Sequence, residues 1–598
     1  MGSGDLVRRM YADFRGVDFR GGEVDLRRSP DSLNMWKDYR NPDGIRKRPY
    51  MVERYGPPIP PGGGGVPESN PGDGPIYSID FCNFGEKQET LVVSGTNLYV
   101  WGKSPGRGLL LQQFAEPGNG KCTTFVFDNV WYLKGSYFFL QYDGTDAKKV
   151  EGYAPTTSIK RTPAGGGEPY QDVNLLTRRR KNTFVGDGES TEFYVDTNNL
   201  DTNEEVIVTV NGEVVEIAAG PGGLRIYKDS VILTEAPPKP LTDGQDNVCI
   251  EFSVLEENEW PYTARNKIDL CRIATVFDNR VFYSGNPYYP NTVWHSSMDD
   301  PTYVSDLDYY IEGQDNAPVK AMVPGNNALW VFKEPSQEHN SIFYHVPTID
   351  SDYGKIYPST HSNVSTGCVA TGTNFNDDIV FFSDKGMEGI AGEVTTEQVV
   401  AHRSSMVDAK LVAEENYKNM ILEEWNGYLL VIIGNKVYLA DSRAMCQIDN
   451  HYEYEWYYWK LGYNVTCTRV HDGVLYLGCD DGVVYTLNEN AGLTYDLPEA
   501  YWTTPLDKFA NPQYLKTTNK RGCVIEASGN FDVYVKTNKS DWERVGEVSD
   551  VDDYRVCRIK RKKFKDIQLK FRSPQRPPRD FVLESATLEC YIGGYIKR

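Results

Sequence analysis

The residue types that most often carry out catalysis are sparse in this chain and poorly placed for it. The 598 residues include seven histidines, and none lies in an HxH, HExxH or clustered Cys/His pattern, so the spacing predicts no catalytic zinc site. The glycines at 62–65 are not followed by Lys and Ser or Thr, which excludes a P-loop. Residues 70–74 lack the spacing and final Glu of a calcium loop and predict a plain turn. We therefore expect neither a metal nor a cofactor.

Carboxylates are abundant, but their spacing does not favour catalysis. Glycoside hydrolysis needs two carboxyl groups about 5 Å or about 6.5–9.5 Å apart. Adjacent residues such as Asp299 and Asp300 point to opposite faces of a strand. Glu257 and Glu259 could share a face, but they lie in a polar segment that is typical of a loop between strands. We therefore expect solvated turns and a protein that is not an enzyme.

An aromatic run at residues 452–459 is a candidate binding surface. Alternation along a strand would place Tyr452, Tyr454, Trp456 and Tyr458 on one face. Packing between adjacent sheets explains such a run without a further function. The alternative hypothesis is that these four side chains form a platform that binds a sugar or a partner protein.

Two basic clusters stand out in an acidic chain. One is residues 178–181, and the other lies within residues 558–565. DNA binding is one interpretation, but a net charge of −21 disfavours a protein that holds nucleic acid by its phosphates. We favour solvated strand faces or contacts to acidic neighbouring subunits. The residues assigned to such a subunit contact are Arg558, Lys560, Arg561, Lys562 and Lys563.

The elements that would position these residues are predicted by a recurring phrase. Seven times, a turn of Asn, Asp or Gly lies beside an aromatic or β-branched run, which predicts β-hairpins. The last five turns are 48, 51, 49 and 46 residues apart, a gap of 150 residues precedes them, and only 31 residues separate the first two turns. This period predicts a β-propeller of six to eight blades with a domain inserted in the gap and a short or split first blade. The turns are at Asn97, Asp128, Asp278, Asn326, Asp377, Asn426 and Asp472.

The expected fold class is mainly β: a roughly seven-bladed β-propeller with an inserted small β-sandwich, and a terminal β-sandwich formed with the N-terminal arm. A second Gly/Pro stretch, at 163–169, is expected to mark the exit from the first blades. Asn211 and Gly212 predict a type I′ hairpin inside the insert. The expected ranges are an arm docked on the ring-forming domain (1–55), a Pro/Gly linker (56–75), the first blades (76–165), the inserted sandwich (178–255), the remaining blades (262–500) and the C-terminal sandwich (503–598).

Composition adds further expectations. Eleven cysteines without a CxxC pair favour buried free thiols made in a reducing cytosol. No run of eighteen apolar residues occurs and the N-terminus is polar and basic, so we expect no secretion signal and no membrane span. Aromatic residues make up 13% of the chain, which suits half-exposed sheets and large contact surfaces.

Several phrases resemble those of bacteriophage tail proteins. The phrases at 284–303 resemble a recurring blade of tail proteins, and the phrase at 184–188 resembles small β-sandwich modules of tail components. The phrases of the arm and of the last blade resemble tail nozzle and tail stabilisation proteins with a β-propeller. These phrases are spread over most of the chain, although each is short. The WD40, kelch and sialidase-propeller signatures are absent. The phrases are Gly44-Ile45-Arg46-Lys47-Arg48-Pro49, Phe184-Val185-Gly186-Asp187-Gly188, Ser284-Gly285-Asn286-Pro287 with Pro290-Asn291-Thr292-Val293-Trp294 and Asp299-Asp300-Pro301-Thr302-Tyr303, and Leu475-Tyr476-Leu477-Gly478 with Asp481-Gly482-Val483-Val484-Tyr485.

The resemblance implies a structural virion protein, the nozzle ring at the distal DNA exit of a short-tailed phage. It implies a homo-oligomer of six copies, contacts to a tail adaptor or portal and to tail fibres or a spike, and transient passage of double-stranded DNA without tight binding. The protein would be assembled in the host cytoplasm and reside in the virion tail. Six copies would carry six times −21, or −126, formal charges, so we expect a channel wall that repels DNA.

Two other classes of function are kept as alternatives. The first is a receptor-binding or baseplate propeller that recognises host cell-wall glycans through the Tyr452–Trp459 platform. The second, which the spacing of the carboxylates disfavours, is a hydrolase of such glycans.

Overall fold

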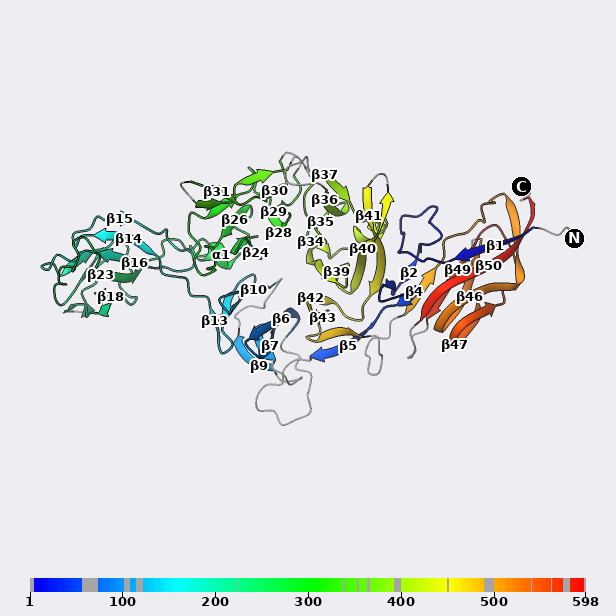
Figure 1. The fold of residues 1–598 in the computed structure, drawn as a ribbon, viewed down its shortest axis with the longest axis horizontal. Coiled ribbons are helices and arrows are strands. Elements are labelled where there is room, and N and C mark those ends of the chain that lie inside the picture. The colour runs from blue at the N-terminus through cyan, green and yellow to red at the C-terminus, as the bar shows by residue number, and fades with distance from the viewer. Residues whose placement is uncertain are drawn as a thin grey trace, which may run out of the picture. The chain divides into compact units, whose positions relative to one another are not determined.

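Nearly all regular structure in the protein is β, which confirms the expected fold class (Figure 1). The helical elements of the described residues are α1 (Asn266–Asp269), α2 (Asp408–Leu411) and one 3-10 turn (Tyr417–Asn419). The chain forms two compact units, one of Met1–Pro117 with Asn363–Arg598 and one of Gly118–Ser362. The computed structural model describes residues 5–55, 74–101, 108–113, 122–221, 223–336, 339–351, 354–362, 366–391, 399–448, 451–488, 499–538, 540–560, 562–573 and 581–595.

The first unit contains, in its described part, four antiparallel four-stranded sheets, which we call blades. Their first strands lie side by side, β6 against β42, β42 against β38 and β38 against β34, as the inner strands of a propeller do. The strands are β6 (Ile76–Phe84), β7 (Lys87–Ser94), β8 (Asn97–Trp101) and β9 (Gly108–Gln113); β34 (Gly372–Phe375), β35 (Asp378–Ser383), β36 (Gly386–Ala391) and β37 (Val399–His402); β38 (Ile421–Trp425), β39 (Tyr428–Ile433), β40 (Lys436–Ile448) and β41 (His451–Lys460); and β42 (Val465–His471), β43 (Val474–Cys479), β44 (Val484–Asn488) and β5 (Tyr50–Tyr55).

The last of these blades takes its outer strand from the other end of the chain. Strand β5 pairs antiparallel with β44, with Thr486 opposite Val52 and Asn488 opposite Tyr50. The end of the expected arm is therefore part of a blade. Residues 56–73 of the expected linker lie outside the described residues.

The second unit contains three further blades among its described residues. Their first strands are again neighbours, β10 beside β24 and β24 beside β28. A small hairpin of β31 (Thr348–Asp350) and β32 (Gly354–Ile356) precedes the last blade strand. The blade strands are β10 (Thr123–Phe127), β11 (Val130–Lys134), β12 (Phe139–Tyr142) and β13 (Ala147–Lys149); β24 (Ile273–Phe277), β25 (Arg280–Ser284), β26 (Thr292–His295) and β27 (Tyr309–Ile311); and β28 (Val319–Gly325), β29 (Ala328–Lys333), β30 (Ile342–His345) and β33 (Ser359–His361).

Six of the seven predicted turns join the first and second strands of a blade, but the turn beside Asn97 does not. In the first blade, Gly95 and Thr96 join β7 to β8, whereas the first hairpin turns at Gly85 and Glu86. The blade is a complete four-stranded sheet. The prediction of a short or split first blade was wrong. The phrase at Asn97 lies at the second hairpin of its blade, whereas the other six phrases lie at the first hairpin, so the interval to Asp128 is shorter than one blade.

The inserted domain is built on a six-stranded sheet in the order β15-β14-β16-β23-β18-β19. The turn between β18 and β19 has φ of 50° at Asn211 and 86° at Gly212, which confirms the type I′ prediction. The Gly/Pro stretch at 163–169 contains the turn after β14 and ends in β15, which pairs with β14. It lies inside the insert, so the expectation that it marks the exit from the blades was wrong. The strands are β14 (Thr156–Arg161), β15 (Glu168–Pro169), β16 (Arg179–Phe184), β17 (Glu192–Tyr194), β18 (Ile207–Val210), β19 (Glu213–Val214), β20 (Ala219–Gly220), β21 (Gly223–Leu224), β22 (Ser230–Ile232) and β23 (Val248–Ser253).

Both ends of the chain build one ten-stranded sheet in the first unit. Its longest strand, β46, alternates buried and half-buried side chains along most of its 24 residues, because one face of the sheet covers the core. Strands β1 and β4 of the arm pair with β50, and β2 pairs with β45. The strands are β1 (Leu6–Tyr11), β2 (Ser32–Leu33), β3 (Met35–Asp38), β4 (Asn41–Lys47), β45 (Ala500–Thr503), β46 (Tyr514–Thr537), β47 (Glu543–Cys557), β48 (Lys563–Phe564), β49 (Ile567–Ser573) and β50 (Val582–Tyr595).

Candidate functional site

The N-terminal arm crosses the aromatic strand β41, which is the outer strand of its blade. The backbone N–H of Val17 donates to the carbonyl of Trp456 at 2.7 Å, and that of Asn34 donates to the carbonyl of Tyr458 at 3.0 Å. A Cβ at Gly16 would lie 2.1 Å from the Trp456 carbonyl oxygen, so only glycine allows this close approach. The arm thus satisfies backbone groups of an outer strand that would otherwise be open to pairing.

A buried ion cluster fastens the arm to the same strand. The Glu455 side chain is completely buried. The Arg28 Nε donates to Glu455 Oε2 at 3.0 Å, and its Nη2 is paired with Oε1. The Arg15 Nη1 donates to Oε1 at 3.2 Å. Loss of one partner from such a cluster leaves an uncompensated buried charge, which is strongly destabilising.

The proposed aromatic platform has the predicted alternation but not the exposure that ligand binding requires. Tyr454 is 2% exposed and Trp456 is fully buried, and both pack with the half-buried Tyr458 in the core between two blades. The Trp456 Nε1 donates to the carbonyl of Arg403 at 2.9 Å. Only Tyr452 of the four is exposed, at 62%. The platform hypothesis is therefore wrong, because the face that the four residues share covers the core.

The opposite face of β41 packs against the arm. Trp36 of β3 contacts Trp425, with ring centroids 5.8 Å apart, and Trp459, with centroids 5.3 Å apart. Trp36 and Trp459 are each buried to at least 99%. Both faces of this strand therefore serve internal packing, and neither is open to a partner.

The basic cluster of the C-terminal domain lies on the loop between β47 and β49. Arg558, Lys560 and Lys563 are exposed, and Lys563 is in β48. The Lys562 Nζ pairs with a carboxylate oxygen of Glu543 in the same domain. Arg561 lies outside the described residues. Arg558, Lys560 and Lys563 are thus open to solvent, whereas Lys562 is engaged within its own domain.

His402 is held between two carboxylates at the outer edge of its blade. Its Nδ1 lies 3.1 Å from Glu388 Oε1 and its Nε2 lies 2.6 Å from Asp408 Oδ2. Burial by itself lowers the pKa of His402, but the hydrogen bonds to these two carboxylates outweigh burial and raise the pKa to about 10. The Ser404 hydroxyl donates to Asp408, not to the histidine. A cationic histidine without a hydroxyl partner cannot act as the general base of a serine hydrolase.

A second histidine, His345, forms a completely buried pair with Glu312. The His345 Nδ1 lies 2.8 Å from the Tyr357 carbonyl oxygen, and its Nε2 lies 2.7 Å from Glu312 Oε1. The carbonyl can only accept a hydrogen bond, so Nδ1 donates and a second proton lies between Nε2 and the carboxyl group. The Ser359 hydroxyl donates to the other Glu312 oxygen at 2.6 Å. The pair joins β30 to the segment after β27 and leaves no group free for a substrate.

The thiols are also unsuited to catalysis. The ten cysteines whose side chains the structure describes are thiols and not disulfides. Burial raises the pKa of the Cys271 thiol to about 12, so it is a thiol and not a nucleophilic thiolate at neutral pH. Within the described ranges, no group of three or more His, Cys, Asp or Glu side chains is arranged to hold a metal ion. Nor does any described helix have the length and apolar character needed to cross a membrane.

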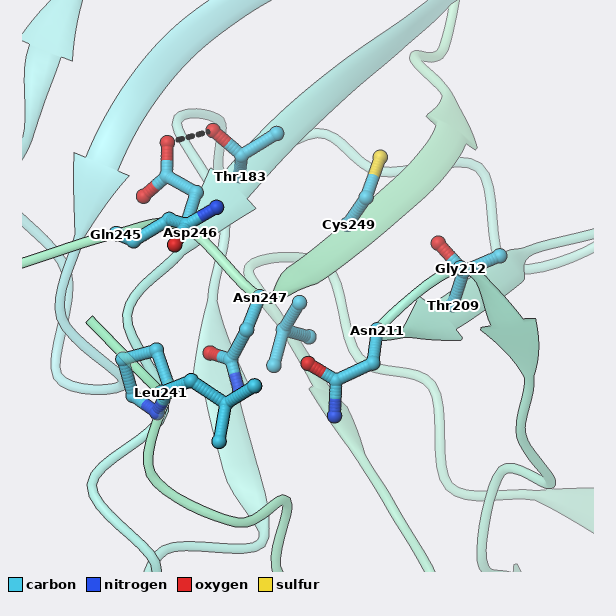
Figure 2. Close-up of a pocket in the computed structure, with 11 residues that line it drawn as sticks. Thr183, Thr209, Asn211, Gly212, Leu241, Gln245, Asp246, Asn247 and Cys249 are labelled. Carbon is cyan, nitrogen blue, oxygen red and sulfur yellow. Dashed lines mark hydrogen bonds between the residues drawn. The ribbon is translucent and has the colours of Figure 1, made fainter.

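An open hollow of about 400 Å³ lies on the inserted domain (Figure 2). The Thr183 hydroxyl donates to Asp246 Oδ2 at 2.5 Å on one side of it. The side-chain amide of Asn247 is engaged by Gly186 and Pro238. Burial raises the pKa of the Cys249 thiol. The hollow therefore offers small polar contacts, and its lining residues include no histidine, lysine or arginine.

Sequence reasoning missed an exposed aromatic cluster in the second unit. Trp260 is 71% exposed, and its ring lies edge-on to that of Tyr288 at 6.2 Å between centroids. Tyr262 is 51% exposed and lies 5.6 Å from Tyr288. The sequence signal was present, since both segments combine aromatic residues with proline at 260–262 and 287–290. Proline interrupts strands and keeps such side chains out of a sheet.

Comparisons with known proteins identify no family for the chain. No family model matches it, and no curated protein sequence does. Similar solved structures include BamB from Moraxella catarrhalis, with 10% identity, a TM-score of 0.31 and coverage of 70% of this chain and 96% of that one. The computationally designed Ika8 protein has 10% identity, a TM-score of 0.28 and coverage of 70% and 98%. An exo-beta-1,3-galactanase from Phanerochaete chrysosporium has 11% identity, a TM-score of 0.20 and coverage of 53% and 94%.

Similarity at this level carries no argument about function. The class of the protein is defined by its own sheets: it is a mainly β protein with seven four-stranded blades in the part described, four in one unit and three in the other.

Proposed function

We propose that this chain is a structural protein of a bacteriophage tail, the nozzle ring that forms the distal DNA exit and supports fibres or a spike. The single observation that carries the proposal is the ten-stranded sheet that the arm and the C-terminal segment build together. A body made from both chain ends suits a scaffold, because it leaves the intervening blades and the insert available for other contacts. The phrases that resemble nozzle proteins provide the link to phage tails.

The chemistry of the described residues is consistent with a scaffold. His345 and His402 are held by internal carboxylates, and seven of the ten described cysteines are buried. The net charge of −21 suits a conduit that DNA crosses without being retained, since each phosphate contact to Lys or Arg would add affinity and slow the passage.

Electron microscopy of phage particles labelled with an antibody against this chain tests the proposal. We expect label at the distal tip of a short tail. We also expect light scattering to show a ring of six copies when the chain is mixed with a tail adaptor or portal. Label elsewhere in the particle, or a chain that stays monomeric with both components, would reject the nozzle role.

A second candidate function, recognition of host cell-wall glycans, is favoured by the aromatic cluster at Trp260. Exposed Trp and Tyr rings provide large amphipathic contact area. A cell-wall pull-down with the full chain and its Trp260→Ala variant tests this role, with Tyr452→Ala as a control at another exposed aromatic side chain. Binding by the native chain that only Trp260→Ala abolishes would support glycan recognition. Absence of binding by the native chain would exclude it.

A further inference from the structure

In the C-terminal sheet, strands β1 and β47 each have a strand partner on one side only. Among the described residues, β1 pairs with β50 and β47 pairs with β46, and no other strand pairs with either. These four strands are labelled together in Figure 1. An open strand edge presents a row of unpaired backbone donors and acceptors and is a template for pairing with another chain. Strands β1 and β47 are thus two such templates.

The directions of the two edges are complementary. Strand β1 is antiparallel to β50, β50 is antiparallel to β46, and β46 is antiparallel to β47. Strand β1 therefore runs antiparallel to β47. If β1 of one copy lay beside β47 of the next, the sheet would continue across the boundary with every pair antiparallel.

Exposed apolar side chains lie on the same face of both edges. The register places Val556 opposite Val524, Val524 opposite Thr587, and Thr587 opposite Met10. Met10 is 59% exposed and Val556 is 54% exposed. Native edges are commonly protected by charge and by bulges, but these apolar residues leave each edge with surface that a neighbour could bury.

Charge favours contact between unlike edges and opposes contact between like edges. Strand β1 contains two arginines and no acidic residue, a net charge of +2. Strand β47 contains five acidic and two basic residues, a net charge of −3. The Arg8 side chain is 70% exposed and is paired with Glu589 of its own sheet, and Arg9 is paired with Asp507. Two β47 strands would repel each other through their acidic excess, whereas β1 places no acidic side chain beside β47.

We propose that β1 of one copy pairs with β47 of a second copy of this chain, so that the C-terminal sheets join head to tail. This inference rests on the proposed ring function and specifies the interface between its subunits. Such a contact is heterologous, because two different surfaces meet, and it closes into a ring when the rotation between copies allows it.

Substitutions of opposite charge at Met10 test the pairing. Met10→Glu places a like charge against β47, whereas Met10→Lys removes the same apolar side chain and adds a complementary charge. We expect Met10→Glu to weaken assembly of the full chain about tenfold or more, and Met10→Lys to assemble within about threefold of the native chain. The two variants should share the native Tm because the side chain is exposed. Equal assembly by the two variants would overturn the inference.

A photo-crosslinking amino acid at position 556 identifies the strand that lies beside β47. Heavy and light isotope-labelled chains are mixed before assembly, so that crosslinks between copies are recognised by their mixed labels. We expect mixed-label crosslinks to residues 5–12. Crosslinks between two β47 strands, or to any other segment, would overturn the inference while leaving the ring role intact. Failure of the native chain to assemble with adaptor or portal would instead reject the proposed function.

Discussion

Strand β41 and the cluster at Trp260 are both rich in aromatic residues, yet one is buried and the other is exposed. Trp456 of β41 is fully buried, whereas Trp260 is 71% exposed. The difference lies in what covers them: β41 packs on one face against a neighbouring blade and on the other against the arm. Aromatic content alone therefore does not mark a binding surface. What decides is whether another segment of the same chain already occupies it.

The largest effect is expected for Trp456→Ala. Removing a fully buried indole leaves a cavity, so the free energy of unfolding should fall by about 4 kcal/mol. Tyr452→Ala on the same strand is the matched control and should change it by less than about 0.5 kcal/mol, because the side chain is exposed. Urea unfolding followed by circular dichroism measures both. Similar losses in the two variants would contradict the assignment of this strand to the core.

Glu455→Ala should release the arm. Arg28 and Arg15 would lose their buried partner, which costs about 3 kcal/mol. Hydrogen exchange should increase at residues 13–34, where the arm contacts β41. The control is Glu168→Ala, which removes an exposed pair with Lys160 and should cost less than about 1 kcal/mol. Unchanged exchange in the arm of Glu455→Ala would show that the ion cluster is not what holds it.

His402 should make stability depend on pH in the alkaline range. Its pKa is raised to about 10 in the folded protein by Asp408 and Glu388, above the ordinary value of about 6.5. A raised pKa contributes stability that is fully present below about pH 6.5 and is lost as pH rises toward 10. We expect a loss of about 3 kcal/mol between pH 7 and pH 10, and a flatter profile for His402→Gln. Glu453 also faces this histidine. Identical pH profiles for the native chain and for His402→Gln would show that His402 is not charged in the folded protein.

The smallest effect on stability is expected for Trp260→Ala. Its side chain contributes little to the core, so the free energy of unfolding should change by less than about 0.5 kcal/mol. Acrylamide should quench the Trp260 fluorescence of the native chain efficiently, and this readily quenched part of the emission should be missing from the variant. A large loss of stability would show that the Trp260 cluster belongs to the core, and the contrast with β41 would then not hold.

The parts of the fold that depend on short-range chemistry were predictable. At Asn326 and Asn327 both φ angles are positive, 52° and 60°, as a two-residue type I′ turn requires and as asparagine tolerates. The hairpin at Asn211 was predicted for the same reason. The first blade shows the limit of this signal, because a Gly-Thr turn also joins its second and third strands. Local chemistry identifies a hairpin but not its position within the blade.

The pairings between distant segments were not predictable in detail. Strand β5 completes a blade whose other strands begin more than 400 residues later, at Val465. The arm was expected to dock, yet nothing in residues 13–36 indicates that its site is the edge of β41. Such partners are chosen by complementarity among surfaces that exist only after the sheets have formed.

Turn residues and alternating side chains, read along the chain, determined that this protein is made of short antiparallel strands and where most hairpins reverse. Both signals act over a few residues, through φ preferences and the twofold period of a strand. The tertiary structure alone decided which face of each strand is buried, which termini share a sheet and which aromatic residues meet solvent. Those outcomes depend on contacts between residues hundreds of positions apart, whose free energy is gained only when the segments pack together.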